Sequence, residues 1–191
     1  MIRRLASWRR LAFIAGGGLV CAIVVFLVVL VVTSLPSRPK GYGKDLPPAR
    51  LLEDFHSYST VETVRSNVRA RGLQWNVIEE PTSPPSKSKP VYIAKVPNFA
   101  HLGATGDLSF FFFRDRLYRI HFAPRDPSAY WNGLLRAEKL HEVRVRANEH
   151  PRAKLGDDVE VWLSIGGISS DAPFVGWRDK RLEDEINYRF D

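Results

Sequence analysis

The stretch Leu108–Phe122, LSFFFFRDRLYRIHF, decides the fold. Two apolar runs flank the charged triplet at 114–116, a pattern typical of a β-hairpin with a polar turn. The consecutive phenylalanines at 110–113 put two rings on each face of a strand. A strand that is apolar on both faces needs cover on both sides, so the sequence predicts that this strand lies in the middle of a sheet.

The residues before this hairpin predict two more strands and a helix. Strands are expected at Leu73–Glu79 and Val91–Val96, on either side of a loop rich in Pro and Ser. A helix is predicted over 60–71, because Ser59 and Glu62 have the spacing of a capping box.

The residues after the hairpin predict a second helix and further strands. The helix is expected over 126–140, with Asp126 or Ser128 at its N-cap. Alternating apolar residues at 143–145 and 159–163 predict two half-buried strands. A last strand is expected to carry three apolar residues, Ile186, Tyr188 and Phe190.

Together these elements predict an α+β fold, an antiparallel-sheet body with two main helices and roughly eight strands. A helix, strands and an Arg-Asp turn occur in 59–122 and again in 126–190, where Phe113–Asp115 corresponds to Trp177–Asp179. Two architectures stay open: two similar helix-plus-four-strand units, or one domain with both helices on a single sheet.

Positive charge is concentrated at the start of the chain. Residues 1–40 hold six of the 28 Lys and Arg residues and none of the 21 Asp and Glu residues. The rest of the chain has 22 basic against 21 acidic residues, a net charge of +1. A nucleic-acid-binding domain carries its basic stripe on the folded body, so this distribution argues against a nucleic-acid partner.

An uncharged segment lies within the basic region. Residues 11–32, LAFIAGGGLVCAIVVFLVVLVV, make a helix about 33 Å long, enough to cross a hydrocarbon core of about 30 Å. We predict a transmembrane helix at 11–33, in contact with membrane lipid, after a basic cytoplasmic tail at 1–10. The alternative is a cleaved signal peptide, whose apolar stretch has only about 7–15 residues.

The basic residues next to this segment orient the chain. Arg9 and Arg10 adjoin the apolar run, which places the N-terminus in the cytoplasm. A Pro/Gly-rich stalk is then expected at 34–48 and an extracytoplasmic, periplasmic domain at 49–191. Pairs of small residues four apart in the transmembrane helix are compatible with a homodimer through that helix.

The motifs predict no catalytic, cofactor-binding or metal site. The single Cys cannot supply a Cys-rich zinc site. Glu138 and His141 form one Glu-x-x-His motif, whereas a di-metal centre needs two. The Gly-rich segment 164–171 matches neither a phosphate loop nor a nucleophile elbow.

Four residues are candidate partner-binding residues. Arg114, Arg116 and Arg119 lie at the predicted hairpin, where they could hold a partner's carboxylate or phosphate. Trp162 falls on the polar face of its strand, and tryptophan is a frequent interface anchor. The arginines could instead protect a sheet edge.

Three functions remain open at this point. The first is a non-catalytic, membrane-anchored accessory module that binds a protein or another envelope component. The second is an envelope enzyme that uses a carboxylate and a histidine, His121 or His141. The third is a passive spacer on an anchor that drives assembly in the membrane.

Overall fold

The computed structural model describes residues 46–79, 91–143, 149–166 and 172–190, which all belong to one compact unit, residues 39–191. The predicted cytoplasmic tail, the transmembrane helix and most of the predicted stalk lie outside the described residues. Within the described ranges, no helix is long and apolar enough to cross a membrane. The anchor therefore stays a prediction from the sequence.

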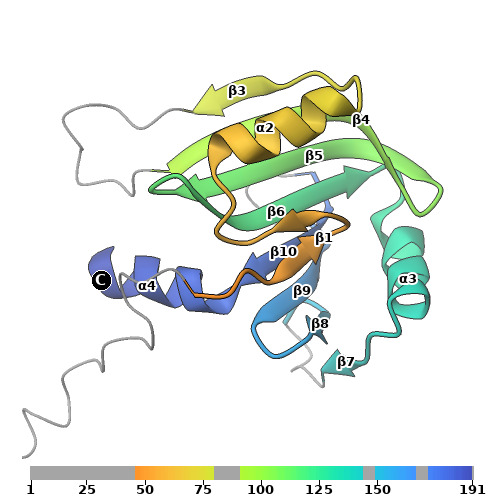
Figure 1. Cartoon of the computed structure of the whole chain (residues 1–191). Helices are drawn as coiled ribbons and strands as arrows, with labels where there is room; N and C mark the ends of the chain where they lie inside the picture. Colours follow the sequence, from red (N-terminus) through yellow and green to blue (C-terminus); the bar gives the residue numbers. More distant parts are fainter. Residues whose placement is uncertain (1–45, 80–90, 144–148, 167–171, 191) are drawn as a thin grey trace, which may run out of the picture. The chain divides into compact units, whose positions relative to one another are not determined.

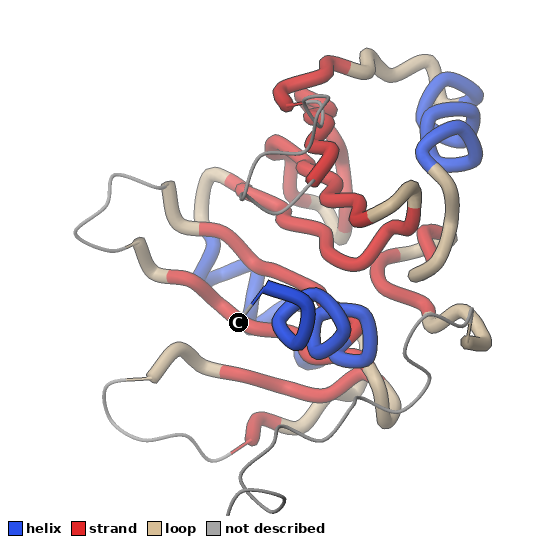
Figure 2. The backbone as a smooth tube through the Cα atoms, turned by 90° about the vertical axis from the view of Figure 1, so that its left-hand side faces the viewer, coloured by secondary structure: helices blue, strands red, loops and turns tan. Residues whose placement is uncertain are grey.

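An eight-stranded antiparallel sheet forms the body, so the fold is α+β (Figure 1). Neighbouring strands follow the order β3 (Asn76–Glu79), β4 (Val91–His101), β5 (Ala104–Phe113), β6 (Arg116–Pro124), β10 (Phe174–Asp179), β9 (Val159–Ser164), β8 (Arg152–Leu155) and β7 (Glu142–Val143). The sheet twists strongly, so the strands of its two halves run in different directions (Figure 1, Figure 2).

The central hairpin forms as the sequence predicts. β5 lies between β4 and β6, and Arg114 and Asp115 make the turn with φ values of 51° and 60°. Two positive φ values are what a tight two-residue hairpin turn requires. Phe112 belongs to the main core cluster, whereas its neighbour Phe113 belongs to a second cluster, because successive side chains point to opposite faces.

Two helices and a small ladder cover one face of the sheet. They are α2 (Val61–Ala70), α3 (Pro127–Ala137), and β1 (Arg50–Leu52) paired with β2 (Phe55–His56). Their contributions to the main core are Leu51, Leu52, Phe55, Val64, Val68, Tyr130, Trp131 and Leu134. α3 is capped by Asp126, one of the two predicted caps. The cap of α2 is Thr60 and not Ser59, because Thr60 accepts the N–H of Thr63.

The predicted C-terminal strand with Ile186, Tyr188 and Phe190 is wrong. A helix, α4 (Lys180–Phe190), occupies this segment and covers part of the opposite face of the sheet (Figure 1). Leu182 and Ile186, one helical turn apart, are buried with Phe113 of β5. The described residues therefore contain three helices, where two were predicted.

Two further segments differ from the prediction. β8 forms where no strand was expected, and it pairs with both β9 and β7. The turn expected after Trp177 is instead the end of β10 and the start of α4, where the Asp179 carboxylate accepts the N–H of Arg181 at 2.9 Å. Asp179 is fully buried, so this cap fixes the direction in which α4 leaves the sheet.

Candidate functional site

Two of the four predicted partner-binding residues meet on the sheet face that carries α4. Arg119 lies on β6 and Trp162 on β9, with β10 between them. Alternation along these strands brings further partly exposed side chains to the same surface. We call this surface the Arg–Trp face and define it by Arg119, His121, Trp162, Phe174 and Arg178.

The indole of Trp162 lies directly on the backbone of β10. Gly176 is its cross-strand neighbour, and a Cβ built on Gly176 would be only 2.4 Å from Cζ2 of Trp162. The guanidinium groups of Arg178 and Arg119 lie 5.1 Å and 5.8 Å from the ring centroid. The absent side chain at Gly176 thus creates the place that the indole fills, between two cations.

His121 is packed among rings rather than beside a carboxylate. Its ring stacks on Phe174 with centroids 4.0 Å apart and an interplanar angle of 18°, and it lies 4.5 Å from the ring of Phe111. Burial, assisted by the charge of Arg119, lowers the pKa of His121 to about 3. The imidazole is therefore neutral at physiological pH, and its Nε2 has no hydrogen-bond partner in the described part of the chain.

An ion network ties α4 to the sheet beside this surface. Four cations share two carboxylates, namely Arg119, Arg152, Arg178 and Lys180 with Glu160 and Glu183. Arg178 bridges the two acids, with Nη2 2.9 Å from Glu160 and Nη1 2.6 Å from Glu183. Burial alone would lower the pKa of Arg178, but Glu183 and Glu160 outweigh burial and raise it.

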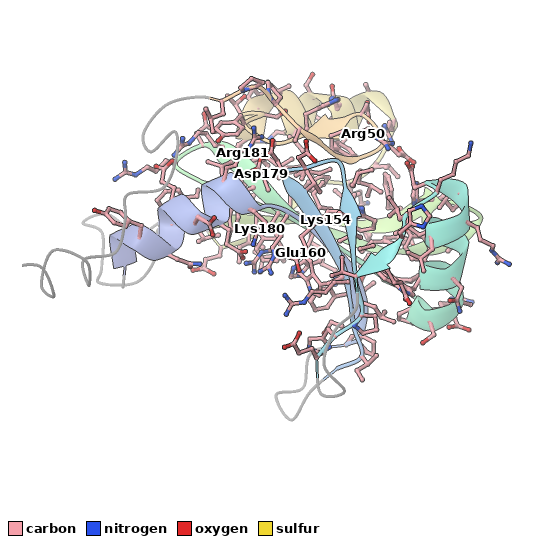
Figure 3. The ribbon with its side chains drawn as sticks, turned by 90° about the horizontal axis from the view of Figure 1, so that it is seen from below. Arg50, Lys154, Glu160, Asp179, Lys180 and Arg181 are labelled. Atoms are coloured by element: carbon pink, nitrogen blue, oxygen red, sulfur yellow. The ribbon has the colours of Figure 1, made fainter. Side chains whose placement is uncertain are left out.

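Figure 3, seen from below, shows Lys154 and Lys180 on either side of Glu160. Lys154 is the cross-strand neighbour of Glu160 on β8, and Lys180 at the start of α4 lies 4.0 Å from Glu160. Both lysines are exposed. The flank of the Arg–Trp face therefore carries two exposed lysines, together with the carboxylates of Glu149, Asp157 and Glu160.

The other two predicted residues lie apart from Trp162. Arg114 is exposed at the hairpin turn, 5.5 Å from the ring of Phe113. Arg116 forms an ion pair of 3.0 Å with Glu185 of α4. The structure thus brings together Arg119 and Trp162 and separates them from the hairpin tip.

Sequence reasoning missed most of the Arg–Trp face. His121 follows Arg119 by two residues and Glu160 precedes Trp162 by two, so strand periodicity alone could have placed each pair on one face. The contribution of Arg178 and Gly176 depends on the pairing of β10 with both β6 and β9. No local pattern carries that information.

A second candidate site lies at the N-terminal end of α3. A cavity of about 600 Å³ opens between the β4–β5 turn and the first turns of this helix, and we call it the α3 cavity. It is lined by Leu102, Gly103, Ala104, Thr105, Arg125, Asp126, Ala129, Tyr130 and Gly133. It shares no residue with the Arg–Trp face.

A buried hydrogen bond supports the wall of this cavity. The Tyr130 hydroxyl lies 2.5 Å from Nδ1 of His101, whose Nε2 is 3.9 Å from Glu53. Burial raises the pKa of Tyr130, so the phenol is protonated. Burial also lowers the pKa of His101, although the charge of Glu53 opposes this. The enzyme alternative named His121 or His141 as the histidine that would lie near a carboxylate, whereas here His101 lies 3.9 Å from the carboxylate of Glu53.

Neither site has an assembled metal-binding group. Among the described residues, no three or more His, Cys, Asp or Glu side chains are grouped so that they could hold a metal ion. Compared with known proteins, the chain matches no family model and no curated protein. The geometry of the two sites is therefore the basis for functional inference.

Proposed function

We propose that this protein is a single-pass, membrane-anchored accessory module whose extracytoplasmic domain binds another protein of the cell envelope without catalysing a reaction. The observation that carries the proposal is the partly exposed Trp162 held between Arg119 and Arg178. Tryptophan and arginine are the residues most enriched among interface hot spots, and here both are fixed on a rigid sheet.

The charge of this surface indicates the chemistry of the partner. Four cations share two carboxylates beside Trp162, and the exposed Lys154 adds a further positive charge. An acidic surface on the partner would complement this excess and steer the encounter. A protein with acidic residues around an apolar contact is the partner that fits best.

The sequence before the domain supplies the anchor in this proposal. The uncharged segment at 11–33 is long enough to span a bilayer, and the stalk would hold the domain close to the membrane on its periplasmic side. Confinement near one membrane raises the effective concentration of a partner in the same membrane, so a modest interface suffices.

We further propose that the domain consists of two similar units. α2 is followed by β3–β6, and α3 is followed by β7–β10. The last strands of the two halves, β6 and β10, pair at the centre of the sheet. The matching Arg-Asp pairs do not support this proposal, because Arg114–Asp115 form a hairpin turn, whereas Arg178–Asp179 end β10.

Site-specific cross-linking tests the proposed interface. A photoreactive residue replaces Phe174 in the full chain within its native membrane, and a matched probe replaces Arg136, which is exposed on α3. We expect a discrete protein adduct from position 174 alone, and we expect Trp162→Ala to weaken it. Adducts from both positions alike, or from neither, would contradict the proposal.

A second function is favoured by one specific observation, the chain of Glu53, His101 and Tyr130 beside the α3 cavity. The phenol and the imidazole are hydrogen-bonded, and the Glu53 carboxylate, which pairs with Arg71, lies 3.9 Å from the imidazole. These are groups that general acid–base catalysis uses. Turnover of any compound in a broad hydrolase panel, abolished by His101→Gln, would favour an enzyme. In the spacer alternative, exchange of the transmembrane helix would abolish function and removal of the domain would not.

A further inference from the structure

We propose that the α3 cavity is a binding site for a small aliphatic ligand that carries a carboxylate. Its volume of about 600 Å³ lies within the range of about 300–1,000 Å³ that small-molecule sites occupy. Two residues on its lining, Gly133 and Leu102, are unfavourable for folding, and a third, Arg125, offers a positive charge.

The first of these residues is Gly133 in the middle of α3. Glycine is less favourable than alanine in a helix interior, so a packing reason is expected. Here a Cβ built on Gly133 meets no atom within 4 Å. The missing side chain leaves the cavity open, and no neighbouring atom in the described part of the protein requires a glycine here.

The second is Leu102 at the tip of the β4–β5 hairpin. Its φ of 49° is unfavourable for a bulky side chain, and the residue is also 48% exposed. Gly103 completes the turn with a φ of 76°, so the same hairpin could form with a small polar residue at position 102. An exposed leucine at the cavity rim supplies an aliphatic surface that a ligand can cover.

The third is Arg125, which is exposed at the start of the loop before α3. No hydrogen bond or ion pair of its guanidinium is present in the described ranges. The neighbouring carboxylate of Asp126 already accepts the N–H of Ala129 at 2.9 Å, as the helix cap. Arg125 is therefore available to bind a ligand's carboxylate through charge-assisted hydrogen bonds, while Leu102 and Ala129 contact its aliphatic part.

The test uses the full chain in lipid nanodiscs and a fluorinated probe, N-trifluoroacetyl-leucine, followed by ¹⁹F line broadening. We expect saturable binding at millimolar probe, at least tenfold weaker binding of N-trifluoroacetyl-leucinamide, and no binding to empty nanodiscs. Hexanoate is then added as a competitor of the probe. Displacement of the probe would indicate that the site takes a plain aliphatic acid, whereas a lack of displacement would indicate that it also needs the amide group of an acylated amino acid.

Two variants and one control assign the binding to this cavity. Gly133→Leu fills the hollow without disturbing the helix, and we expect it to abolish binding. Arg125→Gln should weaken the binding of the carboxylate probe until it equals the binding of the amide. Arg136→Gln, on the exposed part of the same helix, should leave binding unchanged. Equal binding of acid and amide, no binding of either, or full binding to Gly133→Leu would overturn the proposal.

Discussion

Trp162 and Gly176 face each other across β9 and β10, and the indole occupies the space that a side chain at position 176 would need. A Cβ on Gly176 would lie 2.4 Å, 2.6 Å and 2.7 Å from three atoms of the Trp162 ring. A glycine in a central strand normally weakens a sheet, because it packs nothing. Here it allows an aromatic side chain from the neighbouring strand to lie flat on the sheet between two arginines.

This relationship predicts that Gly176→Ala destabilises the protein. The methyl group must displace the indole, and overpacking of this kind costs about 1–3 kcal/mol. In a Trp162→Ala background the space is free, so we expect the same substitution to be neutral or stabilising. A double-mutant cycle by urea unfolding of the full chain in detergent measures the coupling. Equal effects of Gly176→Ala in both backgrounds would show that the indole does not occupy this place.

His121 predicts a loss of stability in mild acid. Its pKa is lowered from 6.5 to about 3 in the folded state by burial and by Arg119. The unfolded chain therefore binds the proton first as the pH falls. Stability is fully present above pH 6.5 and declines below it, with a slope that approaches about 1.4 kcal/mol per pH unit for one proton.

The measurement is the free energy of unfolding at pH 7, 6 and 5, before most carboxylates titrate. His121→Phe should flatten the dependence, leaving the part due to His101, whose pKa is also lowered. Replacement of the exposed His141 by Phe is the matched control for the change of residue type. A slope that His121→Phe does not alter would mean that folding does not lower the pKa of this imidazole.

The ion network predicts that Glu183 holds α4 on the sheet. Glu183→Gln keeps the shape of the side chain but removes the charge that Arg119 and Arg178 share. Hydrogen bonds to charged groups contribute about 1.5–3 kcal/mol each, so we expect a loss of about that size. Hydrogen exchange should accelerate in α4 before it does in β5. The exposed neighbour Asp184 gives the control, since Asp184→Asn should change neither measurement.

The parts of the fold that the sequence predicted are those with strong local signals. The hairpin of β5 and β6 follows from apolar runs around a charged turn, and α3 follows from a proline behind an aspartate cap. α4 was missed because its segment carries two patterns at once. Ile186 and Tyr188 alternate as in a strand, whereas Leu182 and Ile186 are one helical turn apart, and the surface around Phe113 selects the helix.

The candidate sites were harder to predict, because they are assembled by contacts between distant segments. The periodicity of its strand placed Trp162 on a polar face, and Arg119 was expected only at the hairpin. The strand that joins them, β10, comes from a third part of the chain. The α3 cavity likewise combines the β4–β5 turn with α3. A hollow has no sequence pattern of its own, and the only local signal was the unfavourable glycine in α3.

That glycine leads to the last prediction, a gain of stability from Gly133→Ala. Glycine in a helix interior is less stable than alanine by about 0.5–1 kcal/mol, and no atom within 4 Å obstructs the added methyl group. The midpoint temperature of thermal unfolding of the full chain should therefore be higher in this variant. Gly106→Ala is the opposite control, because a Cβ there would lie 2.3 Å from the backbone oxygen of Ala123. A loss of stability in Gly133→Ala would mean that the cavity is filled in the folded protein and that the open lining of α3 is not available to a ligand.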